Sequence, residues 1–196
     1  FWHKMLNIES DEDINDSDSQ PDFNELVVTL NQMANILAGP IVHKPLEFAG
    51  YRLEKFMEAF PTSLFILLKR EPIEVACSIY NTRSKKCENM SDWWSVFPPN
   101  YNNLKDLPVL EQIGGQVKSM NRFYQTATAS YSDRVLELNY ERLCEDPGLV
   151  LDEVVERLKP TYGEIKKLST PILTKPRNLN KYDTSVVEQL KEILKD

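Results

Sequence analysis

The sequence predicts an α/β fold in which a mostly parallel sheet is flanked by helices. Two apolar segments with strand character, 63–69 and 134–139, are each followed by a segment with helical periodicity. The first of them is apolar on both faces, as an interior parallel strand is. Strands that alternate with helices indicate parallel pairing with helices on both sides of the sheet.

The composition favours one globular domain over the whole chain, 1–196. The sequence has 196 residues, of which 41% are hydrophobic and 27% charged, and a chain of this length buries about two thirds or more of its extended surface. The formal net charge of -7 argues against general nucleic-acid binding. Any anion that the protein binds must therefore be held by a local cluster of donors.

The first predicted elements are a loop and two helices. Segment 1–22 is polar and acidic without periodicity, which predicts a loop. Asp11, Asp13 and Asn15 resemble the start of a calcium-binding EF-hand loop, but Asp16 stands where that loop needs glycine, which disfavours calcium binding. Apolar residues then recur at helical spacing up to Leu37. After a short extended piece a second helix follows, whose apolar face holds Leu53, Phe56, Met57 and Phe60.

The remaining elements follow the first strand. We expect a helix with Pro72 in its first turn, because proline is favoured there. Further helices are predicted over 108–130, 147–158 and 184–194, with the second strand at 134–139. The cysteines, Cys77, Cys87 and Cys144, are odd in number and lack metal-ligand spacing, so neither a disulfide framework nor a zinc site is indicated. No apolar stretch reaches the roughly 20 residues of a membrane span.

Arg70 follows the first predicted strand directly. In open α/β sheets, ligands bind beyond the carboxyl ends of the strands. If a helix starts near Glu71, the Ser78 hydroxyl lies on the same side as the Arg70 guanidinium. This pair of donors suits a phosphate monoester, at roughly 1.5–3 kcal/mol for each charge-assisted bond. The alternative is that Arg70 pairs with Glu71 or Glu74 and that Ser78 only packs.

Four segments together resemble the sulfotransferase family, which uses 3′-phosphoadenosine 5′-phosphosulfate (PAPS) as donor. Arg70-Glu71-Pro72, with Ser78 eight places after the arginine, resembles the family's 3′-phosphate motif. The lead-in FPTSLFILLKREP, the loop DWWSVFPP and the segment LELNYERLCEDP are similar to further family segments, in the same order. The best-matching region is 40–159.

This resemblance implies a fold and a donor site. The fold would be the layered α/β fold of P-loop nucleotide hydrolases. Arg70 and Ser78 would bind the 3′-phosphate, and Tyr140 would lie against the adenine, unless it only packs in the core. Lys44 matches a family lysine that reaches the transferring sulfuryl group and the leaving phosphate oxygen. Its alternative is a side chain that simply extends to water.

The resemblance also implies a general base and a C-terminal contact. The family uses histidine or glutamate as the base, and here His43 and Glu47 flank Lys44. His43 has a suitable ordinary pKa near 6.5, but in an extended segment it should point away from its neighbour Lys44, and a buried structural imidazole is its alternative. Arg177 lies in the segment LTKPRNLNKY, which resembles a family segment except that Tyr182 stands where the family has tryptophan. Arg177 would close over the donor, and its alternative is a charge in a solvated loop.

One family feature is absent from this sequence. Family members open with a strand, a loop rich in glycine and threonine, and a helix, and backbone N–H groups of that loop hold the 5′-phosphosulfate. None of the six glycines lies in such a setting. We therefore expect this chain to be an excised piece that holds the 3′ end of the nucleotide and lacks the other half of the donor grip.

The predicted function is sulfuryl transfer from PAPS to a hydroxyl or amine, without a metal, releasing adenosine 3′,5′-bisphosphate. The acceptor is an unidentified small molecule, glycan or peptide, not a nucleic acid. Two alternatives stay open. One is a non-catalytic module that binds adenosine 3′,5′-bisphosphate or a protein partner. The other is a kinase relative, although no Walker lysine or Mg²⁺ carboxylate is recognisable. The compartment is open, with the cytoplasm slightly favoured over the Golgi lumen, and so is the oligomeric state.

Overall fold

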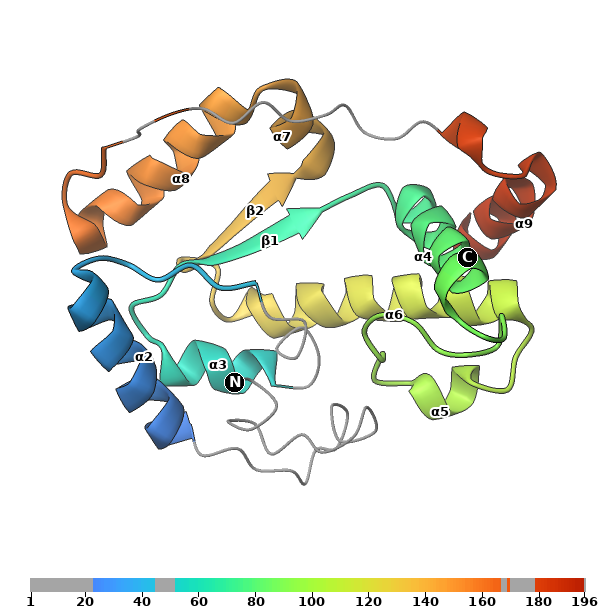
Figure 1. The fold of residues 1–196 in the computed structure, drawn as a ribbon, viewed down its shortest axis with the longest axis horizontal. Coiled ribbons are helices and arrows are strands. Elements are labelled where there is room, and N and C mark those ends of the chain that lie inside the picture. Colours follow the sequence, from blue (N-terminus) through green and yellow to red (C-terminus); the bar gives the residue numbers. More distant parts are fainter. Residues whose placement is uncertain (1–22, 45–51, 167–168, 170–178, 196) are drawn as a thin grey trace.

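The computed structural model describes residues 23–44, 52–166, 169 and 179–195, which form helices around a small parallel sheet (Figure 1). The elements are α2 (Phe23–Leu37), α3 (Leu53–Ala59), β1 (Phe65–Lys69), α4 (Pro72–Lys86), α5 (Tyr101–Leu104), α6 (Val109–Ala129), β2 (Val135–Asn139), α7 (Tyr140–Glu145), α8 (Pro147–Tyr162), the 3₁₀ helix η3 (Leu179–Lys181) and α9 (Thr184–Lys195). The predicted strands and long helices are confirmed. The short helices α5 and α7 were not predicted, and α8 is longer than expected.

The two strands pair in parallel, as predicted. Phe65 lies opposite Val135 at one end of the register, and Lys69 lies opposite Asn139 at the other. Both carboxyl ends therefore lie at the same edge of the sheet. The residues that follow them, Arg70 and Tyr140, are brought side by side at that edge.

The prediction that the first strand is an interior strand covered on both faces is wrong for the described part of the chain. There the sheet has two strands, so β1 has one neighbour. Ile66 and Leu68 expose 48% and 46% of their surface. An apolar run shows that a strand tolerates burial on both faces. It does not show which other segments, if any, cover those faces.

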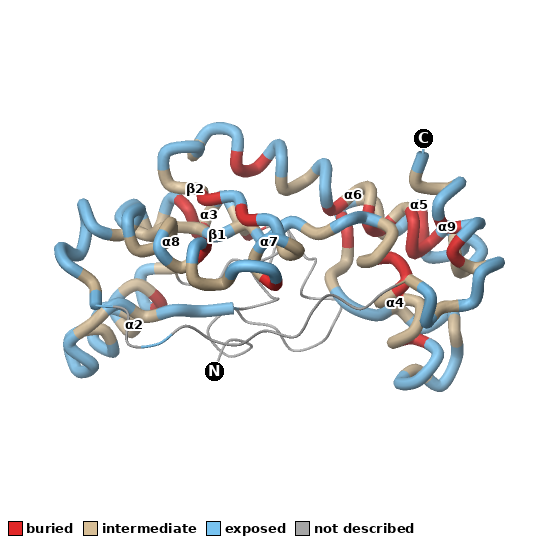
Figure 2. The backbone as a smooth tube through the Cα atoms, turned by 90° about the horizontal axis from the view of Figure 1, so that it is seen from above, coloured by how far each residue is buried: buried red, intermediate tan, exposed pale blue. Residues whose placement is uncertain are grey.

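The main core lies where α4, α6 and α9 meet. Figure 2 shows buried residues gathered along these three helices. The cluster consists of Ala76, Cys77 and Ile79 from α4, Ile113 and Val117 from α6, and Val187 and Leu190 from α9. This packing fixes α4, and with it the side chains that α4 presents at the end of β1.

Smaller clusters hold the rest of the described chain. Leu26 of α2 packs with Phe56 of α3, and Val150 of α8 packs with Leu136 and Leu138 of β2. Proline begins α8 and the Asp146 carboxylate accepts a hydrogen bond from Leu149 N at 3.0 Å, as an N-cap residue should. In the described ranges, none of the helices combines the length and the apolar character that a membrane span requires.

We predict that Gly114→Ala destabilises the protein, because α9 packs closely against α6 at this glycine. A methyl group at Gly114 would overlap the side chain of Ile193. Overpacking costs about 1–3 kcal/mol, and the gain in helix propensity offsets only about 0.5–1 kcal/mol of it. Urea unfolding should show a loss of about 1 kcal/mol.

The matched control is Thr126→Ala, at an exposed position of the same helix. It should leave the free energy of unfolding unchanged or raise it slightly. Equal behaviour of the two variants would mean that α6 and α9 can separate at no cost.

Candidate functional site

Arg70 occupies the turn between β1 and α4. Pro72 stands at the start of α4, as predicted, and its fixed φ suits the first helical turn. Glu71 is the N-cap residue, with an extended backbone at φ -51° and ψ 123°. The chain thus turns sharply after the strand, and the Arg70 side chain lies over the first turns of the helix.

The Arg70 guanidinium contacts a carboxylate and an aromatic ring. Its Nε donates to Glu74 Oε2 at 2.8 Å, and its Nη2 lies 2.7 Å from the same oxygen. The guanidinium carbon lies 4.8 Å from the centre of the Tyr140 ring. The ion pair with Glu74, which the sequence left open as an alternative, is therefore present. Since one oxygen takes both contacts, the Nη1 edge is left for another acceptor.

Arg70 and Ser78 line the same pocket. This cavity, of about 220 Å³, lies between α4 and the loop that follows it. Within the described part of the chain, neither Arg70 Nη1 nor Ser78 Oγ makes a hydrogen bond. The remaining lining residues are Val75, Ile79, Thr82, Trp94 and Ser95. Arg70 and Ser78 therefore border one small cavity, and their binding of a phosphate stays a prediction.

Tyr140 holds the guanidinium from one side. Its hydroxyl is hydrogen-bonded to Cys144, and this bond, followed by burial, raises the pKa of the phenol. The ring therefore stays neutral at physiological pH and presents its face to Arg70. A cation held over an aromatic face gains about 0.5–2 kcal/mol. The expected adenine contact of Tyr140 is untested.

A buried arginine on α4 anchors the loop beside the pocket. Arg83 is fully buried, and its Nη1 donates to Gln112 Oε1 at 2.7 Å. Its Nη2 reaches Gln116 Oε1 at 3.5 Å, and its guanidinium lies 4.9 Å from the centre of the Trp93 ring. Burial lowers the pKa of Arg83, but an arginine stays charged at neutral pH. Amide oxygens and a π face balance this charge.

The two glutamines of this cluster were not predicted to matter. Gln112 donates to the carbonyl oxygens of Lys105 and Leu107, both at 2.9 Å. Gln116 donates to those of Trp94 at 3.0 Å and Val96 at 2.7 Å. The sequence did hold one signal of their burial: each glutamine directly precedes a core residue of α6, Ile113 or Val117. Polar residues at such positions need buried partners.

The predicted catalytic residues lie outside this pocket. His43 and Lys44 are exposed, in a segment that forms no strand, and neither is among the described residues that line the pocket. The alternative of a buried structural imidazole is therefore wrong for His43. Partial desolvation still lowers the pKa of His43. Lys44 reaches solvent, as its alternative stated.

The other candidate residues fall in different parts of the chain. Glu47, Arg177 and the acidic run with Asp11, Asp13 and Asn15 lie outside the described residues. Tyr182 is half-buried and packs against the core of α4, α6 and α9. Among the described residues, no three His, Cys, Asp or Glu side chains are grouped as metal ligands.

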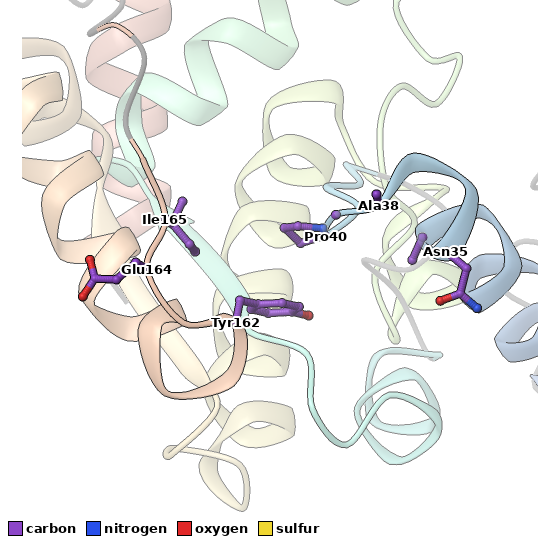
Figure 3. A pocket seen from close by; sticks show the side chains of 8 residues that line it. Asn35, Ala38, Pro40, Tyr162, Glu164 and Ile165 are labelled. Atoms are coloured by element: carbon purple, nitrogen blue, oxygen red, sulfur yellow. The ribbon is translucent and has the colours of Figure 1, made fainter.

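A larger hollow, of about 560 Å³, lies elsewhere in the fold. Figure 3 shows it between the end of α2, with Asn35 and Pro40, and the end of α8, with Tyr162. Its charged lining residue, Glu164, lies 3.1 Å from Lys159 in an ion pair. Chemistry and not size therefore favours the smaller pocket, where a cation and a hydroxyl meet.

Comparisons with known proteins place these residues in a family context. The chain matches the family model described as the sulfotransferase family over residues 7–163. This span includes both strands and every residue that lines the Arg70–Ser78 pocket. Neither the comparison with curated proteins nor the comparison with solved structures found a match.

Proposed function

The chain belongs to the sulfotransferase family, and from this premise we propose that it transfers a sulfuryl group from PAPS to a hydroxyl or amine of its acceptor. The observation that carries the proposal is that Arg70 and Ser78 line one pocket at the end of β1. In this proposal the two side chains bind the 3′-phosphate of the donor. The proposal includes the layered P-loop-like fold that the family match implies.

The pocket offers hydrogen-bond donors for a phosphate group. In this proposal the Arg70 guanidinium and the Ser78 hydroxyl donate to phosphate oxygens. Helix α4 carries both Ser78 and Glu74, the ion-pair partner of Arg70. Val75 and Ile79 keep part of the wall apolar, which strengthens charge-assisted bonds by limiting water. This fit is limited to the 3′ end of the donor, because the described residues supply no glycine-rich loop that would hold its 5′ end.

The donor, when bound, supplies an activated sulfuryl group. The role proposed for Lys44 is to neutralise negative charge at the transferring group and the leaving oxygen, which matters most when the transition state is dissociative. His43 would accept the proton of the acceptor. Its lowered pKa favours the neutral imidazole at physiological pH, the form that a general base needs.

A second function, binding without catalysis, is favoured by one observation. His43 and Lys44 do not line the pocket that holds Arg70 and Ser78. A module that only binds adenosine 3′,5′-bisphosphate needs the pocket and not these two residues. Both functions predict nucleotide binding, and only the enzyme transfers labelled sulfate from PAPS to an acceptor.

We predict that Arg70→Gln and Ser78→Ala weaken the binding of adenosine 3′,5′-bisphosphate. Each lost charge-assisted bond corresponds to roughly 1.5–3 kcal/mol, or about 10- to 150-fold in the dissociation constant. Isothermal titration calorimetry measures the effect. Adenosine 5′-monophosphate, which lacks the 3′-phosphate, should bind the wild type and Arg70→Gln equally weakly.

Lys69→Gln is the matched control for the arginine. Lys69 is the neighbouring cation at the same strand end, exposed and paired with Glu137 at 2.6 Å. Its replacement should change the affinity by less than about threefold, since exposed charges are screened. If Lys69→Gln and Arg70→Gln weaken binding equally, the nucleotide responds to general charge and the assigned pocket is wrong.

We predict that Glu74→Gln raises the affinity for adenosine 3′,5′-bisphosphate about tenfold. The carboxylate neutralises Arg70 and repels a phosphate in the same half-buried site, while the amide keeps one oxygen to accept from Nε. Glu71→Gln, at an exposed position beside Arg70, is the control and should have little effect. A loss of affinity in Glu74→Gln would instead show that its charge is needed to orient the guanidinium.

We predict that kcat/KM rises with pH to a plateau and that the midpoint of this rise lies below the ordinary histidine pKa of about 6.5, because desolvation lowers the pKa of the proposed base His43. His43→Gln should lower the plateau by about 10²- to 10⁴-fold. Lys44→Gln should lower kcat without moving the pH of the plateau. If kcat/KM of His43→Gln equals that of the wild type, the imidazole is not the base, and Glu47 is the remaining candidate.

A further inference from the structure

The outer wall of the Arg70–Ser78 pocket is a short piece of loop, Trp94 and Ser95. This piece lies between α4 and α5 and has no helical or strand hydrogen bonding of its own. Ser95 has a φ of 72°, a left-handed conformation that a residue with a Cβ adopts only when its surroundings impose it. Something outside the loop must therefore hold this wall in place.

Gln116 of α6 supplies that restraint. Its side-chain nitrogen donates to the carbonyl oxygens of Trp94 at 3.0 Å and Val96 at 2.7 Å, so the two bonds bracket the strained Ser95. Its side-chain oxygen accepts from Arg83 at 3.5 Å. Because an arginine can only donate, this contact fixes which end of the amide faces the loop.

Gln116 is buried and does not line the pocket. Its influence on a ligand must therefore pass through the backbone that it holds. We propose that Gln116 is a positioning residue, which sets the outer wall of the Arg70–Ser78 pocket and so the affinity of that pocket for a phosphate-bearing ligand. This inference rests on the proposed function, because it takes the pocket to be the phosphate site.

The same helix provides an internal control. Gln112 is as buried as Gln116, each at 2% exposure. It also accepts from Arg83, at 2.7 Å, and also donates to two backbone carbonyls, those of Lys105 and Leu107. Neither of these carbonyls belongs to a residue that lines the pocket. The two glutamines thus share burial, partner and bonding, and differ in the loop that they hold.

The test compares Gln116→Glu with Gln112→Glu. Glutamate keeps the side-chain length and an oxygen for Arg83, and removes the two N–H donors. We expect Gln116→Glu to weaken the binding of adenosine 3′,5′-bisphosphate about tenfold or more, and Gln112→Glu to change it by less than about threefold. Thermal unfolding should show similar losses of stability in both variants. Gln116→Met and Gln112→Met form a second pair, in case a glutamate prevents folding.

A second measurement does not depend on the nucleotide. Crystal structures of the variants should show the backbone at 94–96 displaced from its wild-type conformation in the Gln116 variants and unchanged in the Gln112 variants. If wild-type protein fails to bind the nucleotide, the proposed function is wrong, and these structures alone decide whether Gln116 holds the wall. Equal nucleotide affinities in the two variants, or an unchanged conformation at 94–96 in the Gln116 variants, would overturn the positioning role.

Discussion

The register between β1 and β2 is the constraint on which the site depends. Lys69 lies opposite Asn139, so the next residue of each strand, Arg70 and Tyr140, meets the other at one edge. A shift of one residue would turn the side chains at this edge to the opposite face. The ring of Tyr140 then could not cover the guanidinium at 4.8 Å, and Arg70 would lose the support that directs it over α4.

Charge balance at this edge sets the conditions under which this acidic protein would hold the proposed anion. The net charge of -7 gives an unfavourable average field, so the pocket must rely on short contacts. Glu74 neutralises Arg70 and fixes its Nε edge, and Arg70 and Ser78 both line the cavity. If the pocket is the phosphate site that we propose, it should favour a doubly charged acceptor over weakly charged ligands, because only the former competes with an ion pair that is already satisfied.

Local patterns in the sequence predicted most of the described fold. Helical periodicity, Pro72 at a helix start and the apolar run before Arg70 each report on neighbours along the chain, and these elements are confirmed. Helical spacing also predicted that Ser78 lies on the same side as Arg70, and both residues line one pocket. The exposure of β1 in the described chain and the buried cluster of Arg83, Gln112 and Gln116 did not follow from the sequence, because they depend on contacts between distant segments. A polar residue at a core position shows that it needs a hydrogen-bond partner, but it does not show which residue that partner is.

The most direct test of the central claim is a crystal structure of the protein with adenosine 3′,5′-bisphosphate. We expect the 3′-phosphate in the pocket between α4 and the Trp94–Ser95 loop, within hydrogen-bond distance of both Arg70 Nη1 and Ser78 Oγ. A nucleotide bound with its 3′-phosphate elsewhere, and with Arg70 in contact with Glu74 and Tyr140 alone, would contradict it.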